Sequence, residues 1–167
     1  MNRDKILLKS RAKQNAKKII IKDHFDSVNY LVFRVVKETY AIENKWIKEV
    51  VRVGSFTTIP GTPDFVVGVA NIRGIIYSAV NINRFLSSKE YGLSELNKLI
   101  IISNGDIEFG IVADEILGFS EKLISAISDV PDNYNSLYKE FISGICDSGA
   151  LILNGRALTE NKKIIIE

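Results

Sequence analysis

The chain is poor in the residues that build cross-links and metal centres: it has one cysteine, Cys146, and one histidine, His24. A single cysteine excludes a disulfide within the chain and favours a reducing compartment. A structural zinc site needs four nitrogen or sulfur ligands, so we expect none within one chain. We therefore predict a domain without metal or cofactor. At about this length a chain buries roughly 70% of its unfolded surface, enough for a core without such links.

Long hydrophobic runs are also missing. No stretch approaches the ~20 apolar residues that a membrane-spanning helix requires. The N-terminal residues are charged but lack the apolar run of a secretory signal. We therefore expect a cytoplasmic protein that does not insert into a membrane.

Motifs of common enzymes are absent from the sequence. Neither the dinucleotide motif G-x-G-x-x-G nor the phosphate-binding motif G-x-x-x-x-G-K-[ST] occurs, and there is no G-x-S-x-G. Asp114 and Glu115 are adjacent, so on a strand they point to opposite faces, which favours turn capping over catalysis. Cys146 is interpreted as a packed, inert thiol. A hydrolase that pairs His24 with a serine is an alternative, but we predict no enzymatic activity.

Charge is distributed unevenly along the chain. Residues 1–22 contain eight lysines and arginines against one acidic residue, a net charge of +7. Because the whole chain carries +2, the remaining residues sum to −5. Apolar residues recur at helical spacing within the basic segment: Leu8, Ala12, Ala16 and Ile19. We predict a helix over residues 3–22 within a basic helical arm over residues 1–26, and a separate domain over residues 27–167.

The partner of this arm is left open by the sequence. Its thin apolar stripe is compatible with docking on the domain, on a second copy or on another protein. Binding to nucleic acid or to an anionic surface is an alternative. The acidic domain would oppose anionic partners, so nucleic acid is not the expected partner.

Short apolar runs separated by turns follow the arm and predict a mainly β domain. The expected strands cover residues 30–35, 39–42, 47–53, 65–70, 75–82, 99–102, 107–112 and 151–153. Lys37 and Glu38 are expected to form the first turn, and residues 83–88 a short helical turn. Residues 116–127 have a mixed pattern without an assigned element. Many short strands with few helices favour small antiparallel barrels. There is no strict repeat, although residues 28–88 and 97–160 share a hairpin-then-strand rhythm.

One segment, FVVGVANIRGII at residues 65–76, resembles the most distinctive segment of the CheW family, F-I-x-G-V-x-N-L-R-G-x-I. Further segments resemble the family in the same order. They are the opening hairpin at 30–33 and 40–42, V-x-E-I at 47–50, I-P-x-x-P at 59–63, V-G-I-V-V-D at 109–114 and Y-I-x-G-[LI] at 141–145. The resemblance covers about residues 28–160.

The resemblance implies two small intertwined SH3-like five-stranded β-barrels with a hydrophobic groove between them, and here an N-terminal helical arm. It also implies a non-enzymatic adaptor. Such an adaptor couples the cytoplasmic tip of a methyl-accepting chemoreceptor to the regulatory domain of a CheA-type histidine kinase. A CheW-like scaffold of a non-flagellar pathway, serving pili or development, is the alternative.

Eight positions form the candidate receptor- or kinase-binding site that the resemblance implies: Ile47, Glu49, Val50, Gly68, Asn71, Arg73, Gly74 and Ile75. An amphipathic receptor hairpin would lay its apolar face on Ile47, Val50 and Ile75. Glu49 and Arg73 would supply charge complementarity, which sets register and specificity.

The sequence also departs from the family pattern. Asn81 and Asn154 stand where the family usually has aspartate, and residues 78–84 lack the usual proline. These departures indicate a divergent member.

Overall fold

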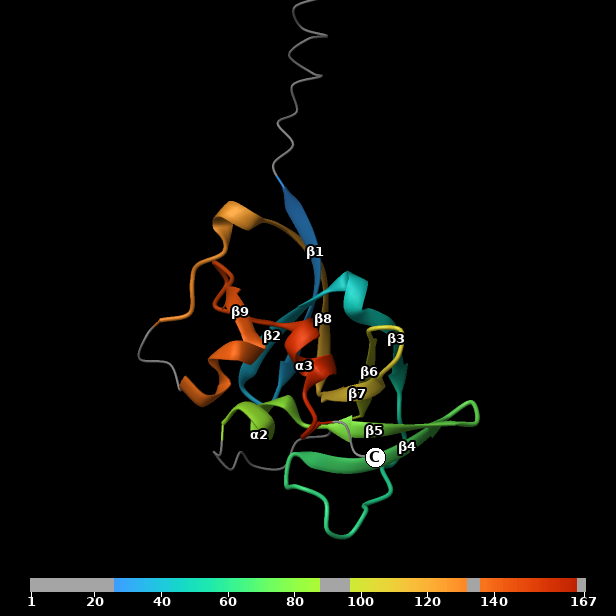
Figure 1. The fold of residues 1–167 in the computed structure, drawn as a ribbon. Coiled ribbons are helices and arrows are strands. Elements are labelled where there is room, and N and C mark those ends of the chain that lie inside the picture. Colours follow the sequence, from blue (N-terminus) through green and yellow to red (C-terminus); the bar gives the residue numbers. More distant parts are fainter. Residues whose placement is uncertain (1–25, 88–96, 132–135, 165–167) are drawn as a thin grey trace, which may run out of the picture.

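The structure, a computed structural model, describes residues 26–87, 97–131 and 136–164. These residues form two five-stranded sheets, here called barrel A and barrel B (Figure 1). Barrel A contains, in spatial order, β8 (Glu115–Leu123), β1 (Ser27–Val35), β2 (Glu38–Glu43), β10 (Leu151–Leu153) and β9 (Ile142–Ile145). Barrel B contains β3 (Ile47–Arg52), β6 (Lys98–Ser103), β7 (Glu108–Ala113), β5 (Ile75–Val80) and β4 (Val66–Ile72). Short helices connect them: η1 (Asn44–Trp46), α2 (Ile82–Leu86), η2 (Ile124–Ala126), η3 (Ser136–Phe141) and α3 (Gly155–Glu160).

The two halves of the chain exchange strands. Each half supplies a hairpin to one barrel and three strands to the other: β1–β2 joins β8, β9 and β10, whereas β6–β7 joins β3, β4 and β5. The predicted mainly β fold of two intertwined five-stranded barrels is thus confirmed. Among the residues that the structure describes, no helix has the length and hydrophobicity needed to cross a membrane.

Both barrels also repeat one topology. Each has an antiparallel edge strand, a hairpin, one parallel contact and a last antiparallel pair. A short helix follows the last strand of each half. The Oδ1 atom of Asn81 accepts hydrogen bonds from the N–H groups of Asn83 and Arg84 at the start of α2. The Oδ1 atom of Asn154 accepts one from the N–H of Ala157 at the start of α3. The two asparagines therefore keep the side-chain oxygen that a helix N-cap requires.

A single bridge closes each barrel. The chain after β3 reaches β4, where Thr57 and Val69 exchange two backbone hydrogen bonds of 2.9 Å. The chain after β8 likewise reaches β9, where Ser128 and Ile145 exchange two of 2.9 Å. Gly68 lies under the first bridge, where a Cβ would overlap the Thr57 carbonyl oxygen and lie 2.8 Å from its carbonyl carbon. Only glycine fits at this close approach of two backbones.

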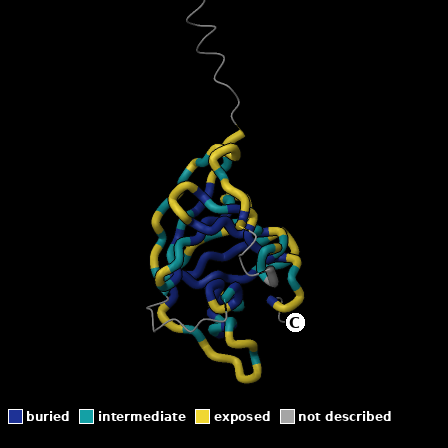
Figure 2. The backbone as a smooth tube through the Cα atoms, turned by 90° about the vertical axis from the view of Figure 1, so that its left-hand side faces the viewer, coloured by how far each residue is buried: buried dark blue, intermediate teal, exposed yellow. Residues whose placement is uncertain are grey.

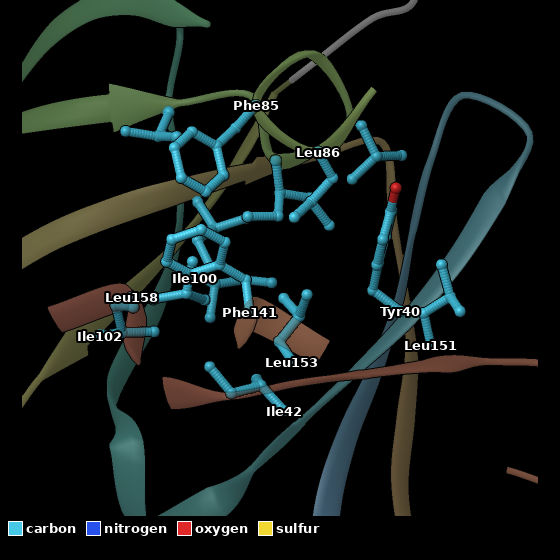
Figure 3. Close-up of a cluster of buried hydrophobic side chains, with 14 of the residues drawn as sticks. Tyr40, Ile42, Phe85, Leu86, Ile100, Ile102, Phe141, Leu151, Leu153 and Leu158 are labelled. Atoms are coloured by element: carbon cyan, nitrogen blue, oxygen red, sulfur yellow. The ribbon is translucent and has the colours of Figure 1, made fainter. Parts of the chain in front are cut away.

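One apolar core joins the barrels, and its buried segments meet at the centre of the molecule (Figure 2). Along β6, Ile100 and Ile102 pack in this shared core, whereas Leu99 and Ile101 pack inside barrel B. Both faces of β6 are buried, which explains its continuous apolar sequence. Figure 3 shows side chains from both barrels and both α-helices in the shared core: Tyr40, Ile42, Phe85, Leu86, Ile100, Ile102, Phe141, Leu151, Leu153 and Leu158.

One local expectation is wrong, and one segment had no assignment. The first hairpin turns at Val36 and Lys37 rather than at Lys37 and Glu38. Val36 has a φ of 58°, and its N–H donates a hydrogen bond to the Asp114 carboxylate, which holds this unusual conformation. The residues with a mixed pattern, 116–127, lie mostly in β8, which pairs with β1 along its whole length. The predicted basic helix, by contrast, lies outside the described residues.

Candidate functional site

The β4–β5 hairpin carries five of the eight predicted site residues. Its two turn residues, Arg73 and Gly74, have φ values of 51° and 88°, as a two-residue type I′ turn requires. Asn71 stabilises the turn, because its Oδ1 accepts a hydrogen bond of 2.8 Å from the N–H of Gly74. Glycine adopts positive φ freely, whereas Arg73 does so at a cost. The turn therefore fixes Arg73 at the tip of the hairpin.

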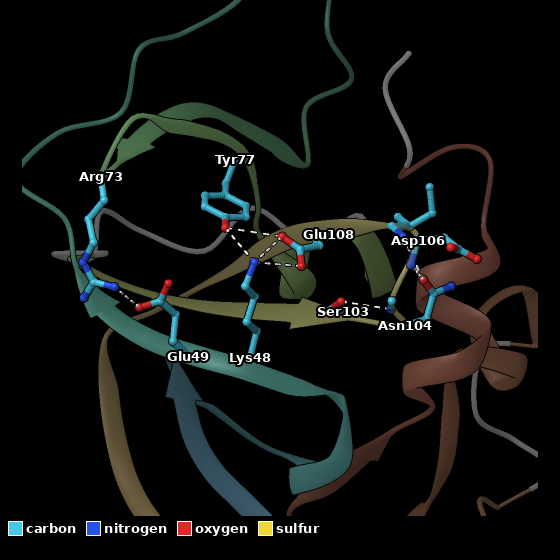
Figure 4. Close-up of polar contacts among 10 residues, drawn as sticks. Lys48, Glu49, Arg73, Tyr77, Ser103, Asn104, Asp106 and Glu108 are labelled. Carbon is cyan, nitrogen blue, oxygen red and sulfur yellow. Dashed lines mark hydrogen bonds and ion pairs between the residues drawn. The ribbon is translucent and has the colours of Figure 1, made fainter.

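Arg73 forms an ion pair with Glu49 on β3 (Figure 4). The distance between Nη1 and Oε2 is 3.0 Å, and the two side chains are 78% and 27% exposed. Exposed pairs of this kind contribute at most about 1 kcal/mol to stability, because water screens the charges. The pair is therefore of small structural value, and the guanidinium keeps donors free for a partner.

A second polar cluster lies beside this ion pair and connects three strands (Figure 4). The Nζ atom of Lys48 on β3 lies 2.7 and 2.8 Å from the carboxylate oxygens of Glu108 on β7. The Tyr77 hydroxyl on β5 lies 3.3 Å from both Lys48 and Glu108. The hydrogen bond with Lys48 lowers the pKa of Glu108 and raises that of Lys48. This cluster holds β3 against β5 and β7, and so positions Glu49 opposite the hairpin tip.

Exposed apolar residues follow Arg73 and Glu49 along the chain. Ile75 and Ile76 follow the turn, and Ile76 is 68% exposed. Val50 follows Glu49 on β3 and is exposed too. A charged pair among exposed apolar side chains is typical of a protein-binding surface. We call the following set the hairpin site: Glu49, Val50, Asn71, Arg73, Gly74, Ile75 and Ile76.

The structure does not bring all the predicted residues to this surface. Ile47 is half-buried and packs against the shared core. Gly68 is buried beneath the bridge at Thr57 and has no surface to offer a partner. Sequence reasoning missed Ile76, whose adjacency to Ile75 was the available signal. It also missed the Lys48 cluster, whose members are distant in sequence.

The residues that the sequence raised as candidates for catalysis lie outside the hairpin site. Cys146 is buried, and desolvation raises the pKa of its thiol. Asp114 caps the first hairpin turn, as expected, and Glu115 forms an ion pair with Arg34. Within residues 26–87, 97–131 and 136–164, no three His, Cys, Asp or Glu side chains gather as metal ligands would. His24 lies outside these ranges.

Comparison with known proteins adds independent findings. The chain is 32% identical over 85 residues to the chemotaxis protein CheW of Bacillus subtilis, covering 51% of this chain and 54% of that protein. It is 30% identical over 102 residues to the protein FrzA of Myxococcus xanthus, covering 61% and 64%. It thus spans less than two thirds of the length of these relatives. The crystal structure of the scaffolding protein TtCheW from Thermoanaerobacter tengcongensis has the same fold, with a TM-score of 0.69 and 24% identity over 81% of this chain and 90% of that one.

A family model matches most of the chain. The model described as CheW-like domain matches residues 29–163, which include both barrels and the hairpin site. The modest identities agree with the divergence seen in the sequence. This chain belongs to the CheW-like domain family.

Proposed function

We propose that this protein is a non-enzymatic chemotaxis adaptor that couples the cytoplasmic tip of a methyl-accepting chemoreceptor to the regulatory domain of a CheA-type histidine kinase. The hairpin site carries the proposal. It presents an ion pair of small structural value together with exposed apolar side chains, on a fold shared with a scaffolding protein. The names of the relatives, which include the chemotaxis protein CheW, support the same role.

The chemistry of the hairpin site suits an amphipathic helical partner. Val50 and Ile76 are exposed and offer apolar contacts to the apolar face of a helix. Arg73 and Glu49 offer one charge of each sign close together, so a partner with complementary charges binds in one register. A receptor tip built from α-helical hairpins has these properties.

Coupling requires a second, separate surface for the kinase domain. The strand exchange gives two barrels of one topology, each with its own outer surface. A barrel-like regulatory domain could therefore bind at one barrel while a receptor binds at the other.

The adaptor would act in the cytoplasm. An adaptor for a pathway other than flagellar chemotaxis is the alternative, and arm-mediated binding to nucleic acid or to an anionic surface is a weaker one.

Calorimetric titration with a receptor-tip coiled coil and with a kinase regulatory domain, taken from the same cell, tests the proposal. We expect both to bind the wild-type chain. Arg73→Glu should weaken binding of at least one partner about tenfold or more, because it places two carboxylates side by side. Circular dichroism should show an intact fold, since Arg73 is exposed.

Arg34→Glu is the matched control, because Arg34 forms the corresponding exposed ion pair with Glu115 on barrel A. This variant makes the same charge change away from the hairpin site. The partner whose binding Arg73→Glu weakens should therefore bind Arg34→Glu with nearly the wild-type affinity. Equal losses for the two variants would show a net-charge effect and contradict the site. Failure of both partners to bind the wild-type chain would contradict the proposed function while leaving the family assignment intact.

A further inference from the structure

The exposed face of β8 is apolar along most of its length. Exposed and half-buried residues alternate along this strand, and the exposed positions include Leu117, Phe119 and Leu123. Ile124, the next residue along the chain, is exposed as well, and Phe119 is 66% exposed. We call Phe119, Leu123 and Ile124 the β8 stripe; Leu117 is the extra residue of a β-bulge and points to the other face. A solvent-exposed row of large apolar side chains is unfavourable in water, so it indicates a surface that another segment covers.

The β8 stripe begins where the N-terminal segment joins the domain. Ser27, at the start of β1, is paired with Leu123, and the N–H of Ile124 donates a hydrogen bond of 3.0 Å to the carbonyl oxygen of Asp26. Figure 1 shows β1 and β8 side by side, and the two strands are antiparallel. Residues 1–25 are therefore attached directly at one end of the stripe.

The dimensions of the two segments are compatible. At about 3.3 Å per strand residue, the distance from Phe119 to Leu123 is roughly 13 Å. The helix that the sequence predicts over residues 3–22 would be about 30 Å long. It is thus long enough to cover the stripe with a few residues left for the reversal of chain direction.

The charges of the N-terminal segment and of the rest of the chain also favour contact between that segment and the β8 stripe. Residues 1–22 carry +7, whereas the rest of the chain carries −5. Glu121 lies between Phe119 and Leu123 in the exposed row of β8, and it forms no ion pair with any residue that the structure describes. Its carboxylate accepts a hydrogen bond from the Ser27 hydroxyl. A basic segment with an apolar stripe would satisfy both the exposed side chains and this carboxylate.

We propose that residues 1–25 of the same chain dock on the β8 stripe. The apolar positions of the segment cover Phe119 and Leu123, and its lysines and arginines lie near Glu121. Because the segment is tethered at Asp26, its effective concentration at the stripe is in the millimolar range or above, so weak contacts suffice. The stripe belongs to barrel A and the hairpin site to barrel B. The inference therefore does not rest on the proposed function.

Paramagnetic relaxation in the full chain tests this inference without any partner. A nitroxide is attached at Gln14→Cys, opposite the apolar stripe of the predicted helix, in a Cys146→Ala background. We expect the amide signals of Phe119 and Leu123 to lose most of their intensity relative to the reduced label. The amide of Ile76 on barrel B should keep its intensity, and an unchanged amide spectrum elsewhere confirms the fold.

Two variants and one mixture complete the test. Phe119→Ser should restore the intensity of the Leu123 amide signal. Ile76→Ser removes an equally exposed apolar side chain on barrel B, and it should leave the loss of Leu123 intensity unchanged. The proposal is overturned if the loss is absent, if it is equal at Ile76, or if it survives Phe119→Ser. A mixture of spin-labelled and isotope-labelled chains should show no loss; a loss there would assign the stripe to the arm of a second copy and contradict docking within one chain.

Discussion

Phe85→Ala is expected to lower the free energy of unfolding by about 3–5 kcal/mol, the usual cost of removing a buried aromatic side chain. Phe85 of α2 is 5% exposed and lies in the core shared by the two barrels. Its ring makes edge-on contacts with Phe65, Tyr138 and Phe141, at centroid distances of 5.1, 6.0 and 4.9 Å. The truncation thus removes three aromatic contacts and leaves a cavity. Urea denaturation followed by circular dichroism measures the loss.

Ile76→Ala provides the control for Phe85→Ala. Ile76 is a large apolar residue on barrel B that is 68% exposed. Its truncation should change the free energy of unfolding by no more than about 0.5 kcal/mol. If Phe85→Ala were as mild as Ile76→Ala, the shared core would not hold the barrels together as described.

Gly68→Ala should destabilise the domain by about 2–4 kcal/mol, from backbone strain and from opening of the barrel B bridge. Gly68 has a φ of 145°, and a Cβ there would overlap the carbonyl group of Thr57. A backbone carbonyl held by the bridge cannot rotate away as a flexible side chain can. Urea denaturation gives the magnitude. Faster hydrogen exchange at the amide of Val69, which donates to the Thr57 carbonyl, would locate the opened bridge.

Two other glycines make this prediction specific. Gly144 occupies the equivalent place beneath the bridge of barrel A, but there a Cβ would overlap the Ile127 side chain and lie 3.0 Å from the Ser128 carbonyl oxygen. Gly144→Ala should therefore cost less than Gly68→Ala, and Gly54→Ala, with nothing within 4 Å, should cost little. A Gly68→Ala variant that keeps full stability and loses only partner binding would contradict the structural explanation and favour a contact role for Gly68.

The sequence predicted most strands because their residues follow the usual burial patterns. The run Leu99–Ile102 is buried on both faces, and the turn after it contains Asn104 and Gly105, so both elements could be recognised. β8 could not be recognised, because several of its apolar residues are exposed and polar residues beside them are half-buried. Phe119 is exposed while Ser120 beside it is half-buried, so hydrophobicity does not mark the inner face. A strand whose apolar residues face outward gives no usable periodicity.

The candidate site was predictable only in part. Asn71, Arg73 and Gly74 stand in one segment whose local turn chemistry fixes the hairpin tip, so a short motif was sufficient. The partner of Lys48 was not predictable, because Glu108 is 60 residues away and is brought close only by the strand order of barrel B. The rhythm shared by residues 28–88 and 97–160 corresponds to a real repeat of element order. The exchange of hairpins between the two barrels does not follow from that rhythm.

The central claim is that one chain bridges two partners, and sedimentation velocity of the three-component mixture tests it most directly. The account predicts one complex that contains this protein, the receptor-tip coiled coil and the kinase regulatory domain together. Arg73→Glu should remove at least one partner from that complex while the variant stays folded. If the receptor and the kinase domain instead displaced each other, or if neither sedimented with the wild-type chain, the adaptor account would be contradicted.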